Sequence, residues 1–303
     1  MSAAELPPAF LRGSYVPLIT PFTDGQVDYD ALAAQVERQV EAGSDGVVVT
    51  GTSGEPSVLT GAERAACYEV AVGAAQGRIP VVAATGAGSL AETLELSRHA
   101  AGAGAAALLV VTPYYIKPPQ RGLIDHFTRV ASIVDLPVLI YHIPGRSGVT
   151  MTVDSVRRVA EEARNVVGVK HASTDLAWAT ELLTTLGPDF RLFCGLEEMS
   201  FPMLGIGASG LMNAVGNIVP RRVAELCQAV AKGDLAMARI LHYELFELNQ
   251  AVFWDTNPIP IKYLMTRLGT LAGGEHRPPL SPPVGEVRAR LDELAVRLAQ
   301  RLK

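Results

Sequence analysis

The stretch Val166-Val167-Gly168-Val169-Lys170 is a short run of apolar residues, most of them β-branched, that ends in an amine. Such a run is typical of a strand buried on both faces of a parallel sheet. In barrel enzymes the carboxyl ends of these strands carry the chemistry. A lysine in apolar surroundings tends to have a lowered pKa, and its neutral amine then attacks carbonyl groups. The alternative is a lysine that ends the strand and points into solvent, and this stretch alone does not decide between the two.

Seven further runs of the same kind occur along the chain, and helical patterns alternate with them. The eight predicted strands are 15–20, 46–50, 80–85, 106–112, 137–142, 166–170, 191–195 and 209–213. Strands that alternate with helices predict a parallel sheet, and eight such units predict an α/β fold closed into a (β/α)8 TIM barrel. Two helix starts have the spacing of a capping box, Thr60 with Glu63 and Ser89 with Glu92.

Helical patterns alone follow the eighth unit, at about 219–232, 235–253, 257–269 and 285–302. The first of these helices completes the barrel. The last one has a clear apolar stripe at helical spacing. The sequence therefore predicts a barrel catalytic domain over residues 1–233 and a C-terminal helical extension over residues 234–303.

Composition excludes several classes of protein. The chain of 303 residues is 49% hydrophobic, which is enough for a large core, and its net charge of -5 is mild. Nucleic acid and anionic membranes are therefore not expected partners. Cys67, Cys194 and Cys227 are far apart, which predicts neither a disulfide framework nor a zinc site but small buried side chains. Without a secretory pattern or a long apolar run, we expect a soluble cytoplasmic protein.

Polar residues follow several predicted strands where a barrel would bring them together. The segment Gly51-Thr52-Ser53-Gly54-Glu55 offers hydroxyls and amides that suit a carboxylate, although a structural turn has the same composition. Thr112-Pro113-Tyr114-Tyr115 and the segment from Tyr141 to Gly148 supply tyrosines that can relay protons. Arg146, in the second of these, is suited to bidentate binding of a carboxylate.

These motifs, together with Gly168-Val169-Lys170 and Asn257-Pro258-Ile259-Pro260-Ile261-Lys262, resemble the dihydrodipicolinate synthase and N-acetylneuraminate lyase family of pyruvate aldolases. The resemblance covers nearly the whole chain. It implies a TIM barrel with a helical extension, a homotetramer built as a dimer of dimers, and a class I mechanism that uses no metal and no cofactor. The expected partners are small-molecule substrates, pyruvate and an aldehyde or keto acid.

The resemblance also implies roles for individual residues. Lys170 would form a Schiff base with pyruvate, and Tyr141 would move protons through Thr52 to Tyr115 of a neighbouring subunit. Thr52 and Ser53 would hold the pyruvate carboxylate. The residues implied to line the same pocket are Gly195 and Met212.

Two features favour the synthase branch, in which pyruvate condenses with aspartate 4-semialdehyde on the route to lysine. Arg146 matches the arginine that would receive the carboxylate of the second substrate, and Asn257-Pro258-Ile259-Pro260 matches the signature of that branch. Pro56, His142 and His171 depart from its pattern. The two histidines are either hydrogen-bonded strand-end residues or signs of a different second substrate. The alternatives are a 2-keto-3-deoxy sugar acid aldolase, or a keto-acid lyase, dehydratase or deaminase.

Two readings from other classes remain. Gly86-Ala87-Gly88-Ser89-Leu90-Ala91 follows a strand and opens a helix, like a degenerate dinucleotide-binding turn, but the acidic residue expected about twenty positions later is absent. A catalytically silent binding protein on the same fold is the second, and the presence of Lys170, Tyr141 and Thr52 argues against it.

Overall fold

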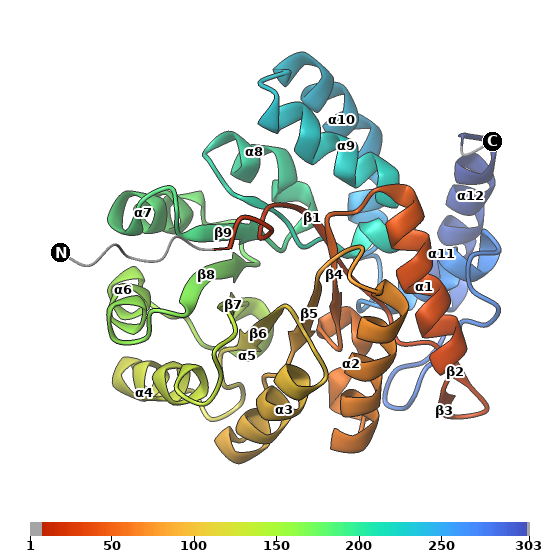
Figure 1. Cartoon of the computed structure of the whole chain (residues 1–303). Helices are drawn as coiled ribbons and strands as arrows, with labels where there is room; N and C mark the ends of the chain where they lie inside the picture. The colour runs from red at the N-terminus through yellow and green to blue at the C-terminus, as the bar shows by residue number, and fades with distance from the viewer. Residues whose placement is uncertain (1–7, 302–303) are drawn as a thin grey trace.

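A closed barrel of eight parallel strands forms the centre of the molecule (Figure 1). The computed structural model describes residues 8–301, so the first seven residues of the predicted barrel domain and the last two of the predicted extension lie outside it. The strands are β1 (Gly13–Pro17), β4 (Gly46–Val49), β5 (Val81–Ala84), β6 (Ala107–Val111), β7 (Val138–His142), β8 (Val166–His171), β9 (Arg191–Cys194) and β10 (Gly210–Leu211). Each pairs with its neighbours in sequence order, and β10 pairs with β1. The predicted TIM barrel is confirmed.

The first and last strands differ from their predicted bounds. β1 begins two residues earlier than predicted and ends at Pro17, while β10 has only two residues. Leu18 and Ile19 after Pro17 are buried although they lie outside the strand, so hydrophobicity alone overstates its length. A small hairpin, β2 (Phe22–Thr23) with β3 (Gln26–Val27), was not predicted. Its strands of two residues each are too short to give a periodic pattern.

Helices surround the barrel between the strands (Figure 1). They are α1 (Tyr29–Ala42), α2 (Gly61–Ala75), α3 (Leu90–Gly102), α4 (Gln120–Ala131), α6 (Val153–Glu162), α7 (Leu176–Leu186) and α9 (Pro220–Ala231), with short α5 (Pro144–Ser147) and α8 (Ser200–Gly205) in loops. The capping box of Thr60 with Glu63 is confirmed at the start of α2. At α3 the hydroxyl of Ser89 accepts from the Glu92 N–H, whereas the Glu92 carboxylate faces Arg64 at 3.8 Å.

The C-terminal helices α10 (Leu235–Ala251), α11 (Ile259–Arg267) and α12 (Gly285–Arg301) lie on one side of the barrel (Figure 1). They share one apolar cluster with β10 and α9, which includes Leu226, Leu245 and Leu291. The division at residue 233 stays a prediction. This shared cluster attaches the extension to the last units of the barrel.

The interior of the barrel holds a separate apolar cluster that includes Tyr15, Tyr141, Phe193 and Met212. Because side chains alternate along a strand, the other residues of each strand pack outward against the helices. Cys67, Cys194 and Cys227 are buried and free, as predicted. Within residues 8–301, no helix combines the length and hydrophobicity needed to cross a membrane.

Candidate active site

Lys170 and Tyr141 lie side by side at the carboxyl ends of β8 and β7, whose register pairs them directly. Lys170 is 3% exposed, and its Nζ lies 4.2 Å from the centre of the Tyr141 ring. The Tyr141 hydroxyl is 3.2 Å from Oγ1 of Thr52, which follows β4. An amine, a phenol and a hydroxyl from three strand ends therefore form one continuous group.

Gly195 and Met212 complete the surroundings of the lysine. A Cβ atom at position 195 would lie 2.6 Å from Cε of Lys170, so the lysine side chain occupies the space that only a glycine leaves open. Met212 is buried in the same interior cluster as Tyr141. The predicted proximity of these two residues to the site fits this arrangement.

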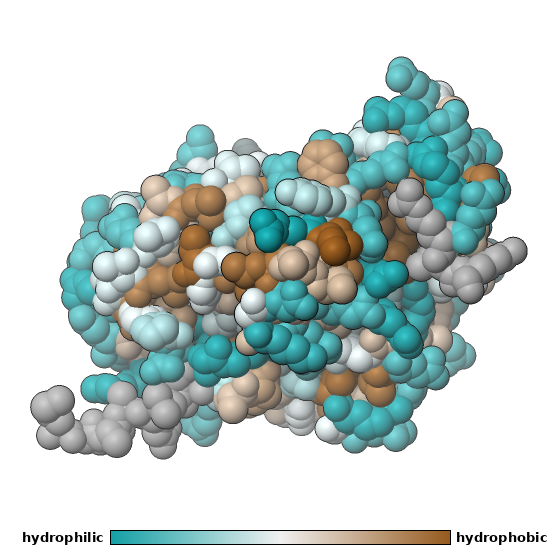
Figure 2. Space-filling view, turned by 90° about the horizontal axis from the view of Figure 1, so that it is seen from above, coloured by the Kyte–Doolittle hydropathy of each residue, from teal (hydrophilic) through white to brown (hydrophobic). Residues whose placement is uncertain are grey.

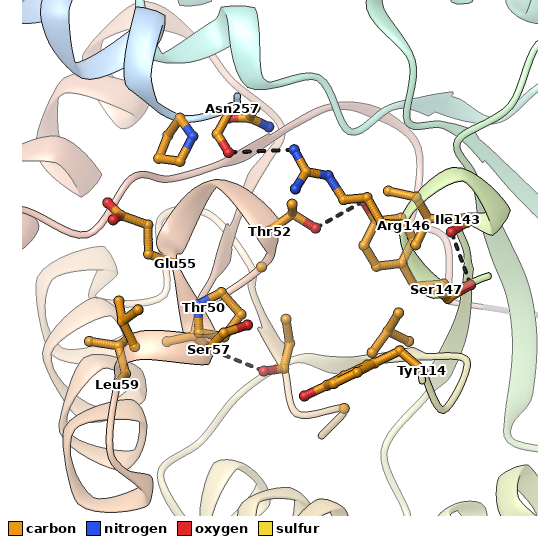
Figure 3. Close-up of a pocket in the computed structure, with 18 of the residues that line it drawn as sticks. Thr50, Thr52, Glu55, Ser57, Leu59, Tyr114, Ile143, Arg146, Ser147 and Asn257 are labelled. Atoms are coloured by element: carbon orange, nitrogen blue, oxygen red, sulfur yellow. Dashed lines mark hydrogen bonds between the residues drawn. The ribbon is translucent and has the colours of Figure 1, made fainter. Parts of the chain in front are cut away.

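The segment with Thr52 and Ser53 forms one turn of 3-10 helix, Thr52–Gly54, and meets the extension (Figure 3). The side-chain amide of Asn257 donates to Oγ of Ser53 at 3.2 Å. The carbonyl of Asn257 lies 3.5 Å from Nη2 of Arg146, which α5 carries. The Arg146 guanidinium points toward Asn257 in Figure 3, and the residue is exposed. Arg146 and Thr52 thus line the same pocket, whereas Ser53 is buried behind it.

A pocket of about 540 Å³ opens at this end of the barrel. Its lining includes Thr52, Tyr114, Tyr141, Arg146 and Asn257. Lys170 is not among the lining residues but lies directly against Tyr141, which is. The pocket volume suits small substrates, and its hydroxyl groups and guanidinium suit anionic ones.

Tyr115 is the predicted site residue that the single chain does not bring to the others. Its side chain is 92% exposed, and its backbone has a φ of 74°, in the left-handed region that residues with side chains rarely adopt. Ile116 beside it is 67% exposed, and Lys117 has a φ of 47°. An unusual backbone that presents large apolar side chains to solvent is a feature of binding surfaces.

His142 and His171 lie next to Tyr141 and Lys170 in sequence but point to the opposite face of the strands. Both rings are buried and stack on Trp178 of α7, at centroid distances of 4.6 and 4.5 Å. The Met151 N–H donates to Nε2 of His142, so the proton of His142 is on Nδ1, which donates to Nδ1 of His171 at 3.0 Å. Neither histidine lines the pocket.

Burial keeps both of these rings neutral. It lowers the pKa of His142 to about 3, with a further contribution from His171. It lowers the pKa of His171 to about 4, although the neighbouring Asp175 acts in the opposite direction. The two histidines therefore serve as hydrogen-bonded strand-end residues, which is one of the two roles that the sequence left open.

Some residues of the site had no assigned role in the sequence. Asn257 was noted only as part of a motif, and its contact with Ser53 joins segments 204 positions apart. Glu197 follows β9 in a stretch without a recognisable motif. Burial raises its pKa, while the charge of Lys170 acts in the opposite direction, and the Ala214 N–H donates to its Oε1 at 2.6 Å. Such contacts depend on the closed barrel and leave no pattern in the chain.

Across the described residues, no three His, Cys, Asp or Glu side chains form a group able to hold a metal ion.

Known proteins match this chain over almost its full length. A sequence model of the dihydrodipicolinate synthetase family matches residues 10–297. The 4-hydroxy-tetrahydrodipicolinate synthase of Thermus thermophilus is 48% identical over 287 residues, which are 94% of this chain and 96% of that protein.

Solved structures agree with this result. The crystal structure of dihydrodipicolinate synthase from Aquifex aeolicus has a TM-score of 0.92 at 40% identity, covering 94% of this chain and 97% of that chain. The chloride-inhibited dihydrodipicolinate synthase from Acinetobacter baumannii, complexed with pyruvate, has a TM-score of 0.91 at 35% identity, covering 96% and 99%. The chain belongs to the dihydrodipicolinate synthetase family.

Proposed function

We propose that this chain condenses pyruvate with aspartate 4-semialdehyde, as a Schiff-base-forming 4-hydroxy-tetrahydrodipicolinate synthase. The observation that carries the proposal is the group formed by Lys170, Tyr141 and Thr52, with the Lys170 amine 4.2 Å from the Tyr141 ring centre and the two hydroxyls 3.2 Å apart. An amine and a hydroxyl relay are the groups that imine chemistry needs. The relative from Thermus thermophilus carries the name of this activity at 48% identity.

In the proposed reaction Lys170 is the nucleophile. Its neutral amine attacks the keto carbon of pyruvate, and loss of water gives a protonated imine. The imine accepts electrons from the adjacent methyl group, which loses a proton and becomes an enamine that attacks the aldehyde carbon. The Tyr141 hydroxyl, within hydrogen-bonding distance of Thr52, carries the protons that these steps require.

The two carboxylates of the substrates have separate positions in this proposal. Thr52 and Ser53 hold the pyruvate carboxylate, because the Thr52 hydroxyl lies 3.2 Å from that of Tyr141 and Ser53 follows it in the same turn. Arg146 binds the carboxylate of aspartate 4-semialdehyde, since its guanidinium is exposed at the pocket opening. Gly195 leaves room for Lys170, and Met212 closes the apolar side of the site.

We propose a homotetramer, a dimer of dimers, as the active form. Tyr115 is 92% exposed and is proposed to enter the site of a neighbouring subunit. A second apolar surface lies on α10, where Ile240, Tyr243 and Phe246 are 51%, 70% and 48% exposed. Figure 2 looks onto the side of the molecule that carries α10 and shows hydrophobic residues gathered among hydrophilic ones. Exposed apolar groups of this kind suit subunit contacts.

Another pyruvate aldolase or lyase of the family is the second candidate, and the departures at His142 and His171 were its main support. Since both rings are buried against Trp178, they give no reason to expect a different second substrate. The test is an assay of pyruvate with a panel of aldehydes and keto acids. The proposal predicts the highest kcat/KM for aspartate 4-semialdehyde. A sugar-derived aldehyde with a higher kcat/KM would favour the second candidate.

A further inference from the structure

We propose that Glu55 and Lys262 are positioning residues for the pyruvate carboxylate. An ion pair between them ties the extension to the turn that carries Thr52 and Ser53. The inference rests on the proposed function, because it assigns the pair to the binding of pyruvate at that turn. Lys262 belongs to the motif that begins at Asn257 and has no other role in the proposed reaction.

The pair is fully enclosed. The side chains of Lys262 and Glu55 are 0% and 1% exposed. Nζ of Lys262 also donates to the Glu275 carbonyl at 2.9 Å and lies 4.2 Å from the centre of the Phe22 ring. Burial lowers the pKa of Lys262, and the charge of Glu55 acts in the opposite direction. The ammonium of Lys262 thus depends chiefly on Glu55 as its charged partner, with a smaller contribution from Glu275, and the Glu55 carboxylate also has Nδ1 of the enclosed His276 side chain at 3.7 Å.

Glu55 acts on the backbone directly after the two hydroxyl residues. Its φ of 55° is left-handed, and its N–H closes the 3-10 turn by donating to the Thr52 carbonyl at 3.2 Å. A residue with a side chain holds this conformation only when its surroundings fix it. The contact of its carboxylate with Lys262 supplies such a restraint, so the pair sets the direction in which Thr52 and Ser53 point.

The same segment of the extension makes a second contact with the turn, through Asn257. Asn257 donates to Ser53 at 3.2 Å, and Lys262 contacts Glu55 five residues later. Helix α11 begins between them at Ile259, and the Lys262 N–H donates to the Pro258 carbonyl at 3.0 Å. Asn257 and the first turns of α11 therefore contact the turn on both sides of Gly54. This arrangement gives the C-terminal extension a part in binding substrate that acts through the turn of Thr52 and Ser53.

Positioning can be separated from stability in this case. A buried ion pair contributes little net stability, because the cost of removing both charges from water offsets their attraction. Replacing both partners by apolar residues of similar size should leave the protein folded, whereas replacing one leaves a buried charge without a partner. The informative variant is therefore Glu55→Met/Lys262→Met. Its control is Arg267→Met, which removes another α11 cation, one that pairs with Asp292 at 2.9 Å on the surface.

The measurement is the pyruvate concentration that gives half-maximal borohydride trapping on Lys170. We expect it to rise about tenfold in the double variant, the effect of one misplaced charge-assisted contact, and to stay at the wild-type value in Arg267→Met. The KM for the second substrate should change less than the KM for pyruvate. A folded double variant with the wild-type dependence on pyruvate would overturn the inference.

A fallback variant and a wild-type control distinguish failure of this inference from misfolding and from failure of the proposed function. If the double variant does not fold, Glu55→Gln takes its place, because glutamine keeps the size and a hydrogen bond to Lys262 but loses the charge. A rise of about threefold is expected for it, and no rise would equally overturn the inference. If wild-type protein gives no adduct with pyruvate, the proposed function fails, and the variants are not the cause.

Discussion

Substitution of Gly195 by alanine is the change that tests most closely how the fold positions Lys170. The new Cβ would lie 2.6 Å from Cε of Lys170, 3.1 Å from its Cγ and 3.2 Å from Cβ of Ala172. Carbon atoms in contact are normally about 3.5 Å apart, so the lysine chain must move by about 1 Å. A displacement of about 1 Å can slow a positioned reaction about 100-fold, or about 2.7 kcal/mol in activation free energy.

Stability should change much less than the rate, because the end of a lysine chain moves more easily than backbone. Overpacking of this kind costs about 1 kcal/mol at the lower end of its range. The assay is the rate of borohydride-trapped adduct formation with pyruvate, alongside thermal unfolding. Gly73→Ala is the matched control, since no atom lies within 4 Å of a Cβ at that exposed position in α2. A folded Gly195→Ala protein that forms the adduct at the wild-type rate would refute the reasoning.

Three other predictions concern the histidine pair, the second substrate and assembly. In the folded chain the pKa values of His142 and His171 are about 3 and about 4, whereas in the unfolded chain both are about 6.5. As the pH is lowered below about 6.5, the two histidines therefore bind protons in the unfolded chain first. The free energy of unfolding should therefore decrease as the pH is lowered from about 6.5 to 4, by up to about 1.4 kcal/mol per pH unit for each histidine. This dependence on pH should be weaker in the double variant His142→Asn/His171→Asn, and an equal dependence in the two proteins would contradict the prediction. Arg146→Ala should keep imine trapping but lower kcat/KM for condensation by about tenfold or more, and loss of trapping in folded protein would reverse its assignment. Mixed Tyr115→Phe and Lys170→Ala subunits should regain part of the activity, because some sites in hybrid oligomers recover both groups; hybrids without recovery would count against a shared site.

The architecture could be predicted because eight apolar strands alternate with amphipathic helices, and each unit repeats the same signal. The predicted strand bounds and connections were less accurate, because local features decide them. The run at residues 15–20 is apolar beyond the last paired residue, Pro17, because those residues are buried without being part of the strand. The hairpin of β2 and β3 escaped prediction because two-residue strands carry no periodicity.

The site could be predicted in part because strand ends meet at one rim. This rule brings Lys170, Tyr141 and Thr52 together from three separate runs of sequence. It says nothing about contacts between the barrel and the extension, such as that of Glu55 with Lys262, which depend on how α11 docks. Alternation along a strand turns His142 and His171 away from the face that carries Tyr141 and Lys170, but their packing on Trp178 depends on how α7 docks against the barrel.

In the proposed reaction, Lys170 is the only amine of the chain that forms the imine. The most direct measurement is reduction with borohydride in the presence of pyruvate, followed by peptide mass mapping of the whole chain. One adduct is expected, on the peptide that contains Lys170, and none is expected in folded Lys170→Ala protein. An adduct on another lysine, or an unmodified Lys170 in folded wild-type protein, would contradict it.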